Sequence, residues 1–97
     1  MMTSVRPTLF MRPGEIATIK QAAHYARRSE ITIRRWCRQY GISRQATPNS
    51  PHEISWVALE MVLQGDFEAL TVFHSGERAS PLVQRYFDHL KIRDDQL

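Results

Sequence analysis

The sequence predicts a single, mainly α-helical domain with a short two-stranded wing and additional C-terminal helices. Two short amphipathic helical patterns follow each other within residues 18–41, and a proline-containing segment without helical periodicity comes next. Three further capped helical patterns complete the chain. With 97 residues, of which 42% are hydrophobic, the chain has room for one modest core.

The first helical pattern begins at Thr18. The segment Thr18-Ile19-Lys20-Gln21 fits a capping box, in which the threonine oxygen and the glutamine side chain each bond a free backbone N–H. Apolar residues then recur at helical spacing and predict a short helix packed closely against a neighbour: Ile19, Ala22, Ala23 and Ala26. Residues 1–14 are expected to form a flexible N-terminal arm, because Pro7 and Pro13 disfavour helix there.

The second helical pattern has its N-cap at Ser29 and ends at Gly41. Its apolar face is expected to meet the core and consists of Ile33, Trp36, Cys37 and Tyr40. The opposite face carries Ile31, Arg34, Arg35 and Arg38, with Thr32 and Gln39 on the flank. An amphipathic helix whose exposed face is mostly arginine is the most informative feature of the sequence.

Residues 42–54 contain two prolines and show no helical periodicity. We interpret them as a turn between two short strands that end at Ile42 and Ile54, with Arg44 in the loop. Three helices are expected after this wing, capped by Ser55, Asp66 and Ser80. Their expected core residues are Trp56, Leu59, Val62 and Leu63, then Phe67, Leu70 and Phe73, and finally Leu82, Val83, Tyr86, Phe87 and Leu90.

Charge is distributed unevenly along the chain. Residues 1–50 carry nine Arg and Lys side chains against two carboxylates, whereas residues 51–97 carry four against eight. Eleven of the thirteen cations are arginine, whose planar guanidinium suits bidentate contact with phosphate or a guanine edge. The front half is therefore expected to meet an anion, and the back half to serve another purpose.

Two short helices joined by a tight turn, the second bearing the cations, form the pattern of a DNA-binding helix-turn-helix. Its candidate DNA contacts are Arg27, Arg28, Thr32, Arg34, Arg35, Arg38 and Arg44. The arginines of the second helix would reach guanine edges or phosphates, and Thr32 a thymine methyl or a phosphate. The two arginines of the turn would flank the DNA backbone, and Arg44 would add a contact through the wing.

The residues Ala17-Thr18-Ile19-Lys20-Gln21-Ala22-Ala23-His24-Tyr25, followed by Ser29 and Thr32-Ile33-Arg34-Arg35-Trp36, resemble the winged helix-turn-helix of excisionases and MerR-type regulators. The resemblance covers residues 17–63. It implies a winged helix-turn-helix DNA-binding domain over residues 15–65, on which residues 66–97 pack as a C-terminal helical extension. It also implies Thr32 and the three arginines of the second helix as recognition contacts, and Arg44 as the wing contact.

Small members of this family are often recombination directionality factors, which have no catalytic chemistry. The resemblance therefore implies a protein that binds and bends attachment-site DNA and directs an integrase toward excision of a mobile element. The acidic C-terminal half would contact the integrase or a neighbouring protomer. Two other roles stay open, a MerR-like transcriptional regulator and a phage small terminase subunit. A different class is a protein-interaction adaptor whose arginines bind an acidic partner.

The remaining counts argue against other classes. Cys37 is the only cysteine, which excludes an internal disulfide and favours the cytoplasm. The four histidines are scattered, so no zinc site and no cofactor are expected. The acids, among them Glu60 and Asp66, are expected at exposed helix faces, caps and tails, so the chain is not expected to be an enzyme. No apolar run approaches the roughly 20 residues that span a bilayer.

Overall fold

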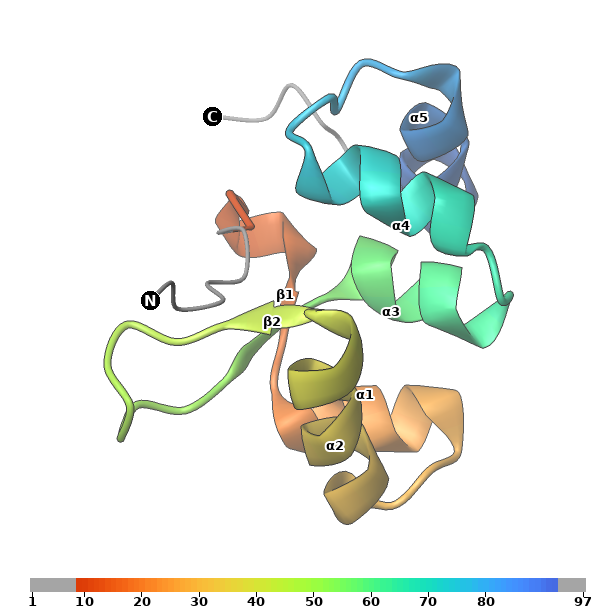
Figure 1. Ribbon diagram of the computed structural model, residues 1–97. Helices are drawn as coiled ribbons and strands as arrows, with labels where there is room; N and C mark the ends of the chain where they lie inside the picture. Colours follow the sequence, from red (N-terminus) through yellow and green to blue (C-terminus); the bar gives the residue numbers. More distant parts are fainter. Residues whose placement is uncertain (1–8, 93–97) are drawn as a thin grey trace.

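The structure, a computed structural model, describes residues 9–92 (Figure 1). Within this range the secondary-structure elements are a 3₁₀ helix η1 (Pro13–Glu15), β1 (Ile16–Ala17), α1 (Ile19–Ala26), α2 (Glu30–Tyr40), β2 (Ser43–Arg44), β3 (Glu53–Ser55), α3 (Trp56–Leu63), α4 (Phe67–His74) and α5 (Pro81–Leu90). The prediction of a mainly α-helical chain is confirmed. The three short strands form one small antiparallel sheet.

The helices start at the predicted caps. Thr18 Oγ1 accepts a hydrogen bond from Gln21 N at 3.0 Å, and Gln21 Oε1 accepts one from Thr18 N at 2.9 Å, so the capping box is present. First-turn backbone N–H groups also donate to the side chains of Ser29, Ser55, Asp66 and Ser80. Helix α2 stops at Gly41, whose φ of 68° is a left-handed conformation that glycine adopts without strain.

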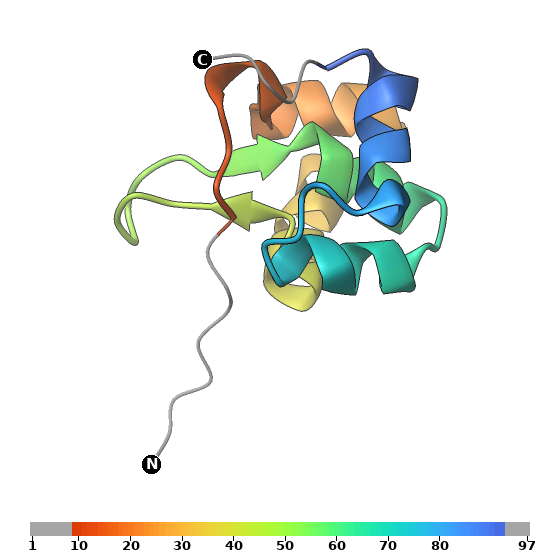
Figure 2. The ribbon, with the colours of Figure 1, turned by 90° about the horizontal axis from the view of Figure 1, so that it is seen from above.

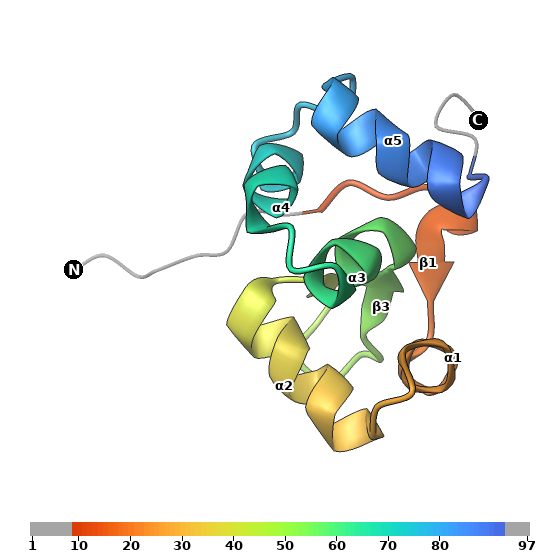
Figure 3. The ribbon, with the colours of Figure 1, turned by 90° about the vertical axis from the view of Figure 1, so that its right-hand side faces the viewer.

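Helix α3 lies between two helix pairs. In Figure 1 the α1–α2 pair lies below it and the α4–α5 pair above it, and Figure 3 shows the same arrangement from the side. Every residue from Val57 to Val62 is buried, so α3 packs on nearly all sides. The core expectation is corrected for Trp56 and Leu63, which are only half-buried and lie at the two ends of the helix.

The sheet has the strand order β1-β3-β2, with both neighbours antiparallel to β3. Ile54 pairs with Ala17 on one side and with Ser43 on the other. The two strands expected around residues 42–54 are present as β2 and β3. They are joined by β1, a two-residue strand too short to show alternation in the sequence. The connection between β2 and β3 projects away from the helices (Figures 1 and 2).

Part of the segment expected to be a flexible arm is packed into the core. Leu9 and Met11 are 3% and 8% exposed, and η1 follows directly. Glu15 at the end of η1 is 1% exposed and accepts a hydrogen bond from Arg78 Nη2 at 2.6 Å. The arm expectation is corrected for residues 9–14, because their apolar side chains and this ion pair attach them to the rest of the chain. Residues 1–8 lie outside the described residues.

Candidate nucleic-acid interface

Helix α2 presents two faces with different chemistry, as the sequence predicts. The core-facing side chains are buried or half-buried and are Ile33, Trp36, Cys37 and Tyr40. The solvent-facing side chains are exposed and are Ile31, Arg34, Arg35 and Arg38. Ile31 is 72% exposed, a high value for a large apolar side chain. The exposed face of α2 therefore combines three cations with one accessible apolar group.

The arginines on this face are largely uncompensated. Arg34 Nη1 lies 3.7 Å from Glu30 Oε1, and both side chains are about half exposed, at 51% and 49%. A surface pair of this kind contributes at most about 1 kcal/mol, so it leaves most of the charge available. Arg35 and Arg38 make no ion pair within residues 9–92. The positive potential of α2 is directed at solvent.

Thr32 lies in the first turn of α2, next to the N-cap. Its Oγ1 accepts a hydrogen bond from Ser29 Oγ at 3.0 Å, and its backbone N donates to the same Ser29 Oγ at 3.1 Å. The Thr32 hydroxyl keeps its own proton for donation, because it acts only as an acceptor in this pair. A phosphate or a base edge at the start of α2 could accept that proton.

The two arginines of the α1–α2 turn lie in different environments. Arg27 is exposed and closes α1 in the left-handed conformation, with φ of 58°. Arg28 folds back on the turn, where its Nη1 donates to the Ala26 carbonyl at 3.1 Å and its guanidinium lies 5.7 Å from the Trp36 ring centroid. Arg27 is therefore the more available of the two for a ligand, whereas Arg28 makes contacts within the turn and with α2.

The predicted wing contact, Arg44, lies on strand β2 and is partly engaged. Its Nε donates to Glu53 Oε1 across the strand pair at 2.7 Å. The loop beyond it is held by polar contacts of its own, including a hydrogen bond from Gln45 Nε2 to the Ser50 carbonyl at 2.6 Å. Glu53 thus neutralises part of the charge that the sequence assigned to the wing.

A groove brings α1, α2 and the β2–β3 connection together. It has a volume of about 360 Å³ and is lined by Thr18, Ile19, Arg34, Gln45, Ser50, Pro51 and His52. His52 Nδ1 and Ser43 Oγ form a hydrogen bond of 3.0 Å. Burial lowers the pKa of His52 from its usual 6.5, and the nearby Arg34 and Arg38 lower it further. Sequence reasoning did not select His52, since only the fold places it beside the arginines of α2.

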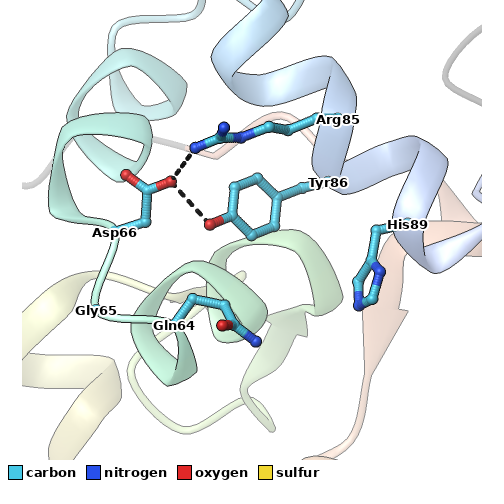
Figure 4. A pocket seen from close by; sticks show the side chains of 6 residues that line it. All are labelled: Gln64, Gly65, Asp66, Arg85, Tyr86 and His89. Atoms are coloured by element: carbon cyan, nitrogen blue, oxygen red, sulfur yellow. Dashed lines mark hydrogen bonds and ion pairs between the residues drawn. The ribbon is translucent and has the colours of Figure 1, made fainter.

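Another cavity lies between the α3–α4 turn and α5. It has a volume of about 650 Å³ and is lined by Gln64, Gly65, Asp66, Arg85, Tyr86 and His89 (Figure 4). Asp66 Oδ2 accepts hydrogen bonds from Arg85 Nη2 and from Tyr86 Oη, both at 2.8 Å, while Asp66 Oδ1 caps α4 at Ala69 N. The hydrogen bond from Tyr86 holds the pKa of Asp66 below its usual value, and burial raises that of Tyr86 to about 12. These bonds attach α5 to the start of α4.

Glu60 corrects the expectation that the acids lie on exposed helix faces. It is 4% exposed and accepts hydrogen bonds from Tyr25 Oη at 2.6 Å and from Gln64 Nε2 at 2.7 Å. The bond to Glu60 raises the pKa of Tyr25 to about 12. This pair joins α1 to α3, so the carboxylate has a structural partner that its helical position alone did not reveal.

Comparison of the chain with protein-family models, with curated protein sequences and with solved structures found no match. None of the helices in residues 9–92 is long and apolar enough to cross a membrane. In the same range, no three His, Cys, Asp or Glu side chains are grouped as a metal site would require.

Proposed function

We propose that this chain binds double-stranded DNA as a winged helix-turn-helix, with α2 in the major groove and the β2–β3 hairpin beside it. One observation carries the proposal: the exposed face of α2 bears Arg34, Arg35 and Arg38, with a single 3.7 Å ion pair among them in the described residues. An α-helix fits the major groove, and arginine pairs bidentately with guanine. The groove that α2 shares with the β2–β3 connection supports the hairpin as the second DNA-contacting element.

The candidate contacts divide by their environment. Arg35 and Arg38 are the best placed to read base edges, because no carboxylate within residues 9–92 pairs with them. Ile31, exposed among these cations, offers an apolar contact to a thymine methyl. Arg27 and Thr32 flank the start of α2, where the helix dipole also favours a phosphate. The ion pair with Glu53 would reduce the charge that Arg44 offers to the DNA.

Salt dependence of duplex binding tests this function. Each cation that neutralises a phosphate contributes about −0.9 to the slope of log K against log[salt], so the six candidate arginines set a limit of about −5 for a linear fall. Fluorescence anisotropy with a labelled duplex, titrated at several salt concentrations, measures that slope. Arg85→Ala is the control for the loss of one cation outside the proposed DNA-binding face, because Arg85 lies on α5 and its removal should leave the slope unchanged. Absence of duplex binding, or a flat salt response, would overturn the proposal and favour an acidic protein partner.

Within this function we propose the excisionase role, in which the protein bends attachment-site DNA in the cytoplasm and directs an integrase toward excision without chemistry of its own. The resemblance of residues 17–63 to excisionases supports this role. The α4–α5 pair, on the other side of α3 from α2, leaves a second surface for an integrase or a neighbouring protomer (Figure 1).

An excision assay with a candidate integrase and its attachment sites, run with and without this protein, tests the role directly. Stimulated excision together with bending of the attachment site, measured by fluorescence energy transfer between duplex ends, is the expected result. Duplex binding without stimulation would instead favour a MerR-like regulator or a small terminase subunit.

A further inference from the structure

We infer that the groove between α1, α2 and the β2–β3 connection holds one DNA phosphate against Arg34 and His52, and that His52 takes up a proton when the phosphate binds. This inference rests on the proposed DNA-binding function and adds a pH dependence to it. Neither His52 nor the groove is among the contacts that the sequence predicts.

The geometry of the groove suits an oxyanion. Arg34 contributes from α2, and Gln45, Ser50 and His52 contribute from the hairpin connection. The α1 residues that line the groove, Thr18 and Ile19, carry no charge. With a volume of about 360 Å³, the groove accommodates a phosphate group and part of the attached sugar. Among the described residues that line the groove there is no carboxylate, and Arg34 and His52 supply positive charge and donors. Glu30, outside the groove, reaches Arg34 only at 3.7 Å, and Gln45 Nε2 is already engaged by the Ser50 carbonyl.

The groups that face His52 favour an anion next to it. Arg34 and Arg38 of α2 act on the imidazole by charge, and Ser43 of β2 holds Nδ1 at 3.0 Å. The neighbouring carboxylate, Glu53, is engaged by Arg44 across the strand pair at 2.7 Å. Within the described residues, no carboxylate contacts the imidazole ring. A bound phosphate would supply the missing negative charge.

The Ser43 hydroxyl can serve both protonation states of His52. It donates to Nδ1 when the imidazole is neutral, and it accepts from Nδ1–H when the ring is charged, because a hydroxyl both donates and accepts. The ring orientation is therefore kept, and Nε2 remains for the phosphate. Burial raises the pKa of the Cys37 thiol on α2, so this thiol stays protonated near neutral pH.

These contacts decide whether duplex affinity rises or falls when His52 takes up a proton. In the free protein, burial and the two arginines keep the pKa of His52 below 6.5. A phosphate in the groove offsets the arginine charges and stabilises the imidazolium, so the pKa rises on binding. Affinity for duplex DNA then increases as the pH falls through the pKa of the complex, by at most about tenfold per pH unit for one proton.

Duplex affinity measured from about pH 5 to about pH 8 at fixed ionic strength tests the inference. We expect wild type to bind more tightly at low pH, and His52→Gln to lose that pH dependence while still binding duplex. His24→Gln is the matched control, since His24 is an exposed histidine of α1 and should leave the dependence intact. In parallel, NMR titration of the His52 ring should show a higher pKa with duplex than without it.

The two proposals fail in different ways. If His52→Gln keeps the full pH dependence, or the His52 pKa does not rise on binding, this inference is overturned while DNA binding stands. If wild type binds no duplex at any pH, the proposed function and this inference fall together.

Discussion

Arginine is used differently in the two halves of the molecule. In the α4–α5 half, Arg78 donates to the buried Glu15 at 2.6 Å, and its guanidinium lies 4.9 Å from the Phe87 ring centroid. Arg85 donates to Asp66 at 2.8 Å. Each of these cations is paired with a carboxylate and attaches one segment of the chain to another.

In the α1–α2 half, Arg27, Arg35 and Arg38 make no ion pair within residues 9–92, and Arg34 reaches Glu30 only at 3.7 Å. The number of charges and their availability for binding are therefore separate properties. A cation paired with a buried carboxylate, as Arg78 is with Glu15, stabilises the fold, whereas cations without a carboxylate partner remain available to bind an anion. Substitutions of paired arginines in the α4–α5 half should therefore lower stability, and substitutions of exposed arginines in the α1–α2 half should weaken binding.

The largest expected effect concerns the Glu15–Arg78 pair. Arg78→Met would leave the Glu15 carboxylate buried without its cation, so we expect the free energy of unfolding to drop by about 3 kcal/mol. Urea denaturation followed by circular dichroism measures the change. Combining Arg78→Met with Glu15→Gln should recover part of it, because the buried charge is then removed. Equal stability of Arg78→Met and wild type would contradict the structural role.

Arg35→Ala and Arg38→Ala should show the opposite behaviour. Each is expected to weaken duplex binding by about 1–3 kcal/mol if it reads a base. Neither should change the free energy of unfolding by more than about 0.5 kcal/mol, because both side chains are exposed. Anisotropy titration and urea denaturation of the same samples test both statements. Wild-type binding by both variants would show that another face contacts the ligand.

Asp66 offers a smaller effect that depends on pH. Asp66→Ala removes the N-cap of α4 and the hydrogen bond from Tyr86, so we expect a loss of about 1–2 kcal/mol in unfolding free energy. The pKa of Asp66 is lowered in the folded state. Its ionic contribution is therefore full above the unfolded pKa of about 3.9 and is lost as the pH falls through the folded pKa. The stability gap between wild type and variant should narrow on acidification.

Arg27→Gly is expected to change both the stability of the fold and the binding of duplex DNA, each by a small amount. Arg27 has a φ of 58°, and glycine adopts this conformation without the roughly 1 kcal/mol strain of a side chain. The variant should therefore be slightly more stable than wild type, while the salt slope of duplex binding should become shallower by about 0.9 if Arg27 contacts a phosphate. Arg27→Asn, which tolerates the same conformation, controls for the backbone effect. An unchanged slope in both variants would remove Arg27 from the contacts.

Much of the local structure could be predicted from the sequence, because caps and helix faces depend on residues three or four positions apart. The capping box at Thr18 and the end of α2 at Gly41 are examples. Contacts between distant residues could not be predicted in this way. Glu15 and Arg78 are 63 residues apart, and Tyr25 and Glu60 are 35 apart. Nothing in the local pattern of either partner indicates the other.

Short-range spacing and capping are enough to predict where the helices begin and which face of α2 carries the arginines. Which charges stay available depends on how the chain packs. The tertiary structure packs α3 on nearly all sides, pairs Arg44 with Glu53, and places His52 beside Arg34. The physical reason is that an ion pair or a groove forms between side chains brought together by packing, and packing joins segments that the chain keeps far apart.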